Sequence, residues 1–144
     1  MSAPDSGPNL IAWWGAGLST LLALVKFYEL WRDRSRVEIS YNFTGDPNIG
    51  NEILIRNLSN RPQILTYWEL LWCSGRWPRR SFESFEGAEY DAGDCRLEAH
   101  TTLTLRFAEA NYFAWGHSAL KGRSIYIRLY FGGRRPTLRK VYAQ

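Results

Sequence analysis

The chain has 144 residues, 45% of them hydrophobic and 15% aromatic, and a formal net charge of +4 at pH 7. That share of aromatic residues is typical of chains that fold on a half-buried β surface, so the composition excludes a disordered tail. The net charge is small for a chain that binds nucleic acid, and no nucleic-acid partner is expected.

The first predicted element is a membrane-spanning helix over residues 10–31, preceded by a short tail over residues 1–9. No charged side chain occurs between Gly7 and Val25. A hydrocarbon core about 30 Å thick needs roughly 20 helical residues. The segment is apolar all round, unlike a surface helix, and it lacks the positive start and cleavage site of a signal peptide. The residues expected inside the bilayer include Leu10, Trp13, Trp14, Leu18, Leu22 and Val25.

Basic residues follow the predicted span and indicate its orientation. A basic linker is expected over residues 32–36, and all 18 Lys and Arg residues lie at or beyond position 26. Positive residues near a span favour the cytoplasmic side of a membrane. We therefore predict a single-pass membrane protein with its N-terminus outside and its C-terminal domain in the cytoplasm. The juxtamembrane basic residues are Lys26, Arg32, Arg34 and Arg36.

One face of the predicted helix carries small residues. Ala12, Ala16, Ser19 and Ala23 recur at spacings of 4, 3 and 4, which places them on the same side of a helix. Small side chains let two helices approach closely in lipid. The sequence therefore predicts a homo-oligomer contact through these four residues.

Beyond residue 36 the hydropathy pattern is that of β-strands. Apolar and polar residues alternate most clearly over 37–43, 101–107 and 124–131, and weaker strands are predicted over 52–58, 63–72, 80–85 and 137–142. The segment 108–121 breaks this pattern, and Asn111–Trp115 offers apolar residues at the offsets of a short helix. About seven short strands predict a mainly β fold, an immunoglobulin-like antiparallel β-sandwich over 37–144, with a small β-barrel as the alternative.

The apolar phase of the clearest strands identifies the predicted core. A shift of one residue in register would turn every side chain of a strand to the opposite face. If the register is right, Arg128 lies on the outer face. The residues predicted to point inward are Ile39, Tyr41, Leu103, Leu105, Ile125, Ile127 and Leu129, joined by Trp68.

One short segment resembles part of an immunoglobulin-like domain. Ile53–Asn57, a polar turn with Arg61 and Pro62, and the apolar residues that follow are similar to the second hairpin of many such domains. The resemblance implies a fold and no function, because sandwiches host many unrelated activities.

Side chains that could carry chemistry are few. Cys73, Cys95, His100 and His117 are separated by 21, 4 and 16 residues, which matches no paired-ligand zinc pattern. In reducing cytosol the two cysteines are expected to be free thiols. The acidic residues between Glu83 and Glu98 lack the ligand order of an EF-hand and predict a solvated loop. We therefore predict no catalytic, cofactor or metal site, and no enzyme.

Basic residues gather toward the C-terminus, with seven Lys or Arg and no acid from Lys121 to Gln144. Since the predicted span holds the domain close to lipid, anionic headgroups are favoured over nucleic acid as their partner. Two glycosylation sequons, at Asn42 and Asn57, would matter only in a secretory lumen. The candidates for contact with an anionic surface are Tyr126, Arg128, Arg134, Arg135, Arg139 and Lys140.

The expected function is a non-enzymatic interaction or accessory module at the cytoplasmic membrane face, with the lipid bilayer and an unidentified protein as partners. The alternative is a ligand-sensing membrane effector, whose β domain binds a small anionic ligand and whose helices assemble to perturb the membrane. The effector needs a polar, basic-lined pocket inside the β domain. The interaction module needs an exposed aromatic patch or sheet edge.

Overall fold

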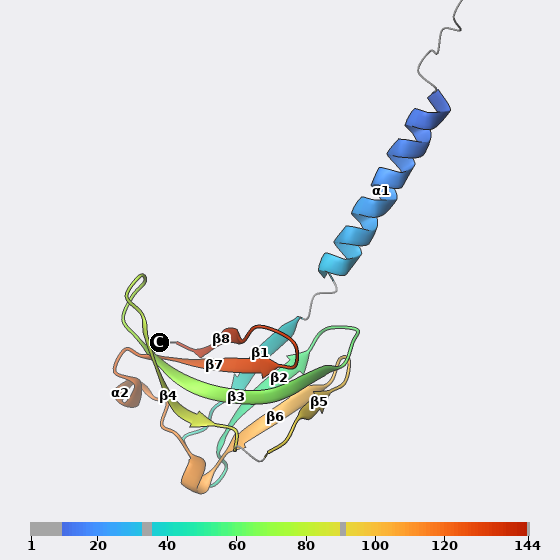
Figure 1. Ribbon diagram of the computed structural model, residues 1–144. Coiled ribbons are helices and arrows are strands. Elements are labelled where there is room, and N and C mark those ends of the chain that lie inside the picture. Colours follow the sequence, from blue (N-terminus) through green and yellow to red (C-terminus); the bar gives the residue numbers. More distant parts are fainter. Residues whose placement is uncertain (1–9, 33–35, 90–91, 144) are drawn as a thin grey trace, which may run out of the picture. The chain divides into compact units, whose positions relative to one another are not determined.

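The computed structural model describes residues 10–32, 36–89 and 92–143 of a chain that divides into two compact units, Met1–Arg34 and Ser35–Gln144 (Figure 1). The first unit contains helix α1 (Leu10–Arg32). The second, here called the β unit, holds eight strands in two antiparallel sheets within these residues. The predicted tail over 1–9 and Arg34 lie outside the described residues, as do the side chains of Leu10 and Arg32.

Helix α1 is a continuous apolar helix of 23 residues. It is rich in Leu and Ala, which favour helix, and it contains no proline. The Thr20 hydroxyl donates to the Ala16 carbonyl oxygen at 2.8 Å, so this polar group is satisfied within the helix. The stretch Ile11–Leu30 is long and apolar enough to cross a membrane.

The smaller sheet has the strand order β1-β2-β6 and is antiparallel throughout. In its register Ile55 lies between Ile39 on one side and Leu103 on the other. The apolar phases of the three strands therefore share one face, as the alternation predicts. The strands are β1 (Val37–Asn42), β2 (Asn51–Asn57) and β6 (Thr102–Phe107).

The larger sheet has the order β4-β3-β7-β8, and β5 pairs with the first residues of β3. β3 is 12 residues long, and two register shifts along it mark bulges that bend the strand (Figure 1). β5 escaped prediction because three residues are too few to show a period. The strands are β3 (Gln63–Ser74), β4 (Ser81–Gly87), β5 (Cys95–Leu97), β7 (Ser124–Phe131) and β8 (Thr137–Tyr142).

Both sheets contribute to one hydrophobic core. Ile53 and Ile55 of the smaller sheet are fully buried, and so is Leu70 of β3. The predicted register of β7 is confirmed, because its inward side chains are 0% exposed: Ile125, Ile127 and Leu129. The other predicted core residues that pack against this cluster are half-buried: Ile39, Trp68, Leu103 and Leu105.

The prediction for Tyr41 is wrong, because this side chain is 46% exposed. β1 is an edge strand, so a residue near its end has a neighbouring strand on one side only. The Tyr41 ring contacts Phe43 and Tyr142, at centroid distances of 4.8 and 5.5 Å. Tyr41 therefore covers the gap between β1 and β8 rather than filling the core.

The predicted second hairpin is also wrong. β2 and β3 belong to different sheets, so residues 58–62 carry the chain from the smaller sheet to the larger one. Within the described ranges the two sheets remain separate ladders, and no barrel closes. The sequence could not reveal this, because a polar turn between two apolar strands looks the same in a hairpin and in a crossover.

The connection from β6 to β7 contains two short helical pieces, η1 (Glu109–Asn111) and α2 (His117–Leu120). A short helix therefore does form within 108–121 as predicted, but it is α2 and does not cover Asn111–Trp115. Instead, the Tyr112 hydroxyl and the Trp115 indole nitrogen both donate to the Thr44 carbonyl oxygen, at 2.9 and 3.0 Å. These bonds hold the aromatic side chains against the β1–β2 loop, a tertiary contact that local spacing does not reveal.

Candidate functional surfaces

The structure keeps the two thiols apart. Cys73 lies opposite Phe82 of β4, whereas Cys95 of β5 lies opposite Leu65 near the other end of β3. The strand from Leu65 to Cys73 spans roughly 26 Å at about 3.3 Å per residue. A disulfide needs Cα atoms within about 7 Å. Both cysteines are free, and this fold excludes a bond between them.

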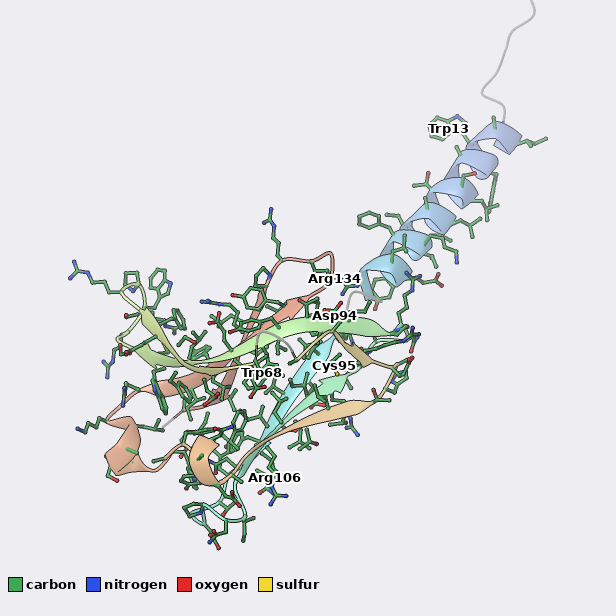
Figure 2. All side chains as sticks on the ribbon, turned by 60° about the horizontal axis from the view of Figure 1, so that its bottom comes forward. Trp13, Trp68, Asp94, Cys95, Arg106 and Arg134 are labelled. Carbon is green, nitrogen blue, oxygen red and sulfur yellow. The ribbon has the colours of Figure 1, made fainter. Side chains whose placement is uncertain are left out.

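Side chains of the kinds that bind metals are dispersed. The described part of the chain holds no group of three or more His, Cys, Asp or Glu that could hold a metal ion. His100 Nε2 lies 2.8 Å from Asn60 Oδ1, and His117 begins α2. In the acidic cluster Glu98 is paired with Arg96, and Asp94 is exposed on a loop (Figure 2). Asp91 of that cluster lies outside the described residues.

The β unit has a proximal end, where the chain arrives at Arg36, and a distal end at the far end of β3. The Leu58 amide donates to the Arg36 carbonyl oxygen at 2.8 Å, and the Gly132 amide donates to that of Ile64 at 2.9 Å. Because a short turn joins Leu58 to Ile64, these bonds bring the β7–β8 hairpin to the proximal end. The exposed residues there form what we call the proximal surface: Arg36, Leu58, Arg61, Ile64, Arg134 and Arg135.

A fully buried amide, Asn57, organises the proximal end. Its Oδ1 accepts from the Ser59 amide, the Ser59 hydroxyl and Gln63 Nε2, at 3.0, 2.6 and 2.9 Å. Its Nδ2 donates at 2.9, 3.2 and 3.1 Å to the carbonyl oxygens of Arg61, Leu97 and Glu98. The Asn57 side chain therefore has no room for a glycan in the folded β unit.

Two small cavities of the β unit can be compared with the basic-lined pocket that the effector alternative needs. One of about 210 Å³ at the proximal end is lined by Pro62, Gln63, Ile64, Phe131, Gly132 and Arg134, so one cation borders it. The buried Gln63 Oε1 has no hydrogen-bond partner within the described ranges. The other, of about 150 Å³, has no charged lining residue: Leu65, Thr66, Tyr67, Trp68, Ala88, Ala92, Gly93, Cys95, Leu103 and Leu105. The latter cavity does not have the basic lining that the effector alternative requires.

The outer face of the larger sheet uses two of the predicted contact residues internally. Arg128 Nη1 lies 2.7 Å from Glu69 Oε1, and the Tyr130 hydroxyl donates to the same oxygen at 2.8 Å. Partial burial alone would raise the pKa of Glu69, but the bonds from Tyr130 and Arg128, with the Arg128 charge, hold that pKa below its ordinary value. Tyr126 meets Phe82 edge to face at 5.5 Å. The Arg128 charge is therefore compensated within the sheet.

The remaining predicted cations lie on the edge strand β8. Lys140 is opposite Tyr126 and Arg139 is opposite Ile127, so the two side chains leave the strand on opposite sides. Both are exposed. Of the predicted contact residues, Arg134 (Figure 2) and Arg135 lie with Arg36 at the proximal end. Arg139 and Lys140 lie further along the larger sheet.

A surface that the sequence analysis missed is the β3–β4 hairpin tip, Gly75–Arg80, at the distal end (Figure 1). Trp77 is 79% exposed, the highest value among the large hydrophobic residues that the structure describes in the β unit. Arg76, Arg79 and Arg80 are exposed beside it. The signal was present in the sequence as a Trp among three Arg residues directly after a Ser-Gly turn.

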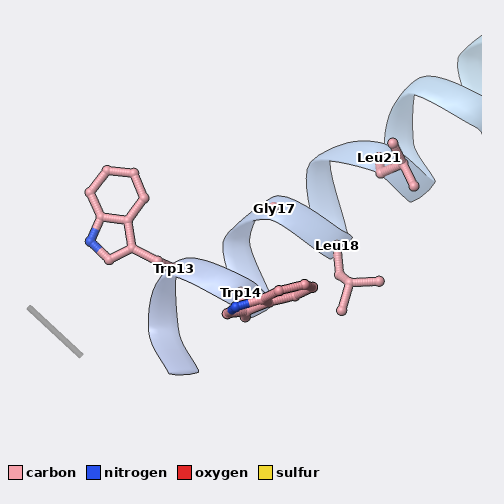
Figure 3. A pocket seen from close by; sticks show the side chains of 5 residues that line it. All are labelled: Trp13, Trp14, Gly17, Leu18 and Leu21. Atoms are coloured by element: carbon pink, nitrogen blue, oxygen red, sulfur yellow. The ribbon is translucent and has the colours of Figure 1, made fainter. Parts of the chain in front are cut away.

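Helix α1 carries an apolar notch on one side (Figure 3). The notch is open to its surroundings, has a volume of about 410 Å³ and is lined by Trp13, Trp14, Gly17, Leu18 and Leu21. At roughly 100° per residue this notch lies on the opposite side of the helix from the predicted small-residue face. That face comprises Ala12, Ala16, Ser19 and Ala23.

No model of a known protein family matches the chain, and no curated protein matches it either.

Proposed function

We propose that the protein is a single-pass membrane protein whose β unit, a β-sandwich, acts as a non-enzymatic interaction or accessory module at the cytoplasmic membrane face. The observation that carries this proposal is the uncovered apolar surface of α1. Ile11, Trp13 and Phe27 are 82%, 74% and 71% exposed. Water would solvate such a helix poorly, whereas the hydrocarbon core of a bilayer suits it on every side.

The orientation rests on the basic residues after the span. Lys26 Nζ lies 2.8 Å from Glu29 Oε2, so part of its charge is compensated within the helix. Arg32, Arg34 and Arg36 follow within a few residues. Because the bias of Lys and Arg sets the topology of a span, the C-terminal side is assigned to the cytoplasm.

The sandwich assignment is supported by two antiparallel sheets that share one core. An immunoglobulin-like relationship is part of the proposal and rests on this layered arrangement alone. The effector alternative would need an anionic ligand inside the β unit, and the cavity that borders β3 and β6 has no charged lining residue. Exposed arginines beside exposed apolar side chains favour the interaction module.

The first partner in this proposal is the bilayer itself. From Arg32 to Arg36 the chain can reach at most about 14 Å when fully extended. A β unit tethered so closely would present the proximal surface, with its four arginines, to anionic headgroups. Each arginine near such a surface contributes about 1 kcal/mol.

The experiment is a topology assay on the full chain. A cytoplasmic reporter fused after Gln144 should be active, the protein should stay with membranes after alkaline extraction, and Leu18→Arg with Leu22→Arg should release it. Release of the unaltered protein would contradict the span. A reporter signal on the outer side would contradict the orientation. The fold already excludes a Cys73–Cys95 bond and a glycan on Asn57 in either topology.

A further inference from the structure

The hairpin tip Gly75–Arg80 is a tight, protruding turn. Gly75 has φ +84°, and a Cβ at this position would collide with the Arg79 carbonyl oxygen. Only glycine therefore allows the two sides of the loop to close this tightly. The tip extends from the paired ends of β3 and β4, where Ser74 lies opposite Ser81 (Figure 1).

Trp77 is the tryptophan of the β unit that the fold leaves uncovered. Trp68 contacts Phe107, Trp72 stacks on Phe85 at 4.0 Å, and Trp115 contacts Phe43. Trp77 has no such ring contact within the described ranges and is 79% exposed. This large aromatic side chain on a tight turn contributes nothing to the core, so its apolar surface is available to a partner.

The charge on the tip specifies the partner further. Arg76, Arg79 and Arg80 are all exposed, and no acid occurs from Ser74 to Phe82. By contrast, Arg128 on the same sheet is compensated by Glu69 at 2.7 Å. The three tip charges therefore remain for an anionic surface outside the chain.

We propose that the Gly75–Arg80 tip inserts Trp77 into the interface of an anionic bilayer while its three arginines contact the headgroups. Tryptophan prefers the headgroup level of a membrane, and arginine is attracted to anionic lipid. A narrow convex tip suits a soft bilayer, whereas a folded partner would need a matching pocket. The inference rests on the proposed function, because α1 would hold the β unit next to this bilayer at high effective concentration.

The proposal has a geometric consequence for the β unit. β3, which is 12 residues long, runs from the proximal surface to the tip, a length of at most roughly 40 Å. For both ends to contact headgroups, the unit must lie along the bilayer rather than stand on it.

The test uses the full chain labelled with 5-fluorotryptophan in lipid nanodiscs that contain a gadolinium headgroup lipid. The sequence has seven Trp residues, and the resonance missing from Trp77→Phe identifies Trp77. In discs of phosphatidylcholine with phosphatidylglycerol, we expect several-fold broadening of this resonance. In phosphatidylcholine alone the broadening should be much smaller. The triple variant Arg76→Gln, Arg79→Gln, Arg80→Gln should abolish the difference.

A matched triple variant removes the same charge elsewhere. Arg56→Gln, Arg96→Gln and Arg106→Gln alter exposed side chains on β2, β5 and β6 and should leave the Trp77 broadening unchanged. An unshifted Trp68 resonance shows that each variant is folded. If the matched variant has the same effect as the tip variant, net charge rather than the tip is responsible, and the proposal fails.

The helix tryptophans separate this inference from the proposed function. Trp13 and Trp14 should be broadened in every disc if α1 is embedded. Broadened helix resonances with an unbroadened Trp77 would overturn the inference alone and leave the tip for a protein partner. Unbroadened helix resonances would overturn the proposed function and the inference with it.

Discussion

The two ends of the β unit both place arginines beside exposed apolar side chains, but they are built differently. At the proximal end, Asn57 is held by carbonyl oxygens of Leu97 and Glu98, about 40 positions away in sequence. At the distal end, Gly75 closes a tip of six residues on itself. The proximal surface therefore depends on the whole fold, whereas the distal tip depends on one local turn.

This difference determines how each surface can be altered. A change at Asn57 acts on long-range contacts and should destabilise the entire β unit. A change at Gly75 should stay local, because the tip contributes little to the core. Mutations can thus separate the roles of the two surfaces.

The largest effect is expected for Asn57→Ala. The carbonyl oxygens of Arg61, Leu97 and Glu98 would lose this donor, and Gln63 would lose one of its two acceptors. We expect a loss of at least about 3 kcal/mol in the free energy of unfolding, measured by urea unfolding of the full chain in detergent. Asn42→Ala, at an exposed site on β1, is the control, with a change below about 0.5 kcal/mol. Equal effects of the two variants would show that the buried network does not organise the proximal end.

Gly75→Ala should have the next largest effect, a loss of about 2 kcal/mol in the stability of the distal end. The new methyl group would meet both a left-handed backbone and the Arg79 carbonyl oxygen. Amide exchange should accelerate in β3 and β4 next to the tip and not around Asn57. Gly133→Ala supplies the control, since its φ is +72° but its surroundings are open, and it should cost about 1 kcal/mol. A cost at Gly75 no larger than at Gly133 would refute the close contact.

Glu69→Gln tests the outer face between the two ends. We expect a loss of about 1.5 kcal/mol at pH 7, since Arg128 and Tyr130 lose a charged partner. The pKa of Glu69 is lowered in the folded state, so its contribution is present above the ordinary carboxyl pKa of about 4.3. That contribution is lost as pH falls through the folded pKa.

Thermal unfolding across this acidic range should therefore be less dependent on pH in Glu69→Gln than in the unaltered chain. Glu83→Gln, at an exposed site on the neighbouring strand β4, should change stability by less than about 0.5 kcal/mol. If Glu69→Gln and the unaltered chain show the same pH dependence of thermal unfolding in acid, this ion pair does not stabilise the sheet.

The smallest effect is expected for Arg134→Gln at the proximal surface. Binding of the soluble segment 33–144 to phosphatidylglycerol vesicles should weaken by about 1 kcal/mol, without a change in unfolding. Added salt should weaken binding of the unaltered segment, as the Debye length falls from about 10 Å at 0.1 M to about 3 Å at 1 M. Arg106→Gln, at the opposite end of the smaller sheet from Asn57, should bind as the unaltered segment does. Equal weakening by both variants would contradict a specific role for the proximal surface.

The sequence predicted what depends on local periodicity. Eight alternating residues in β7 were enough to place Ile125, Ile127 and Leu129 in the core. Tyr41 has the same phase on β1, but its exposure depends on β1 being an edge strand, which is a property of the assembled sheets. The short strand β5 forms through its pairing with β3, and its own three residues carry no period.

For the candidate surfaces, too, the sequence showed local patterns but not contacts between residues far apart in the chain. The basic C-terminal segment was visible, but the ion pair of Arg128 with Glu69 joins residues 59 positions apart. The Trp77 tip is local and could have been found, because Arg-Trp-Pro-Arg-Arg follows a glycine between two apolar strands. A tryptophan in a turn was overlooked because this residue type is more often buried.

Because the two thiols lie far apart on the larger sheet, their labelling rates can report on the opening of two different regions. Cys95 is partly exposed on a short strand, and Cys73 is 6% exposed in the middle of a sheet. A thiol reagent should modify Cys95 whenever β5 opens briefly at the edge of the larger sheet, and Cys73 when the distal end of β3 separates from β4 and β7. The two labelling rates would then time opening at the two ends of β3 in one molecule, without denaturant.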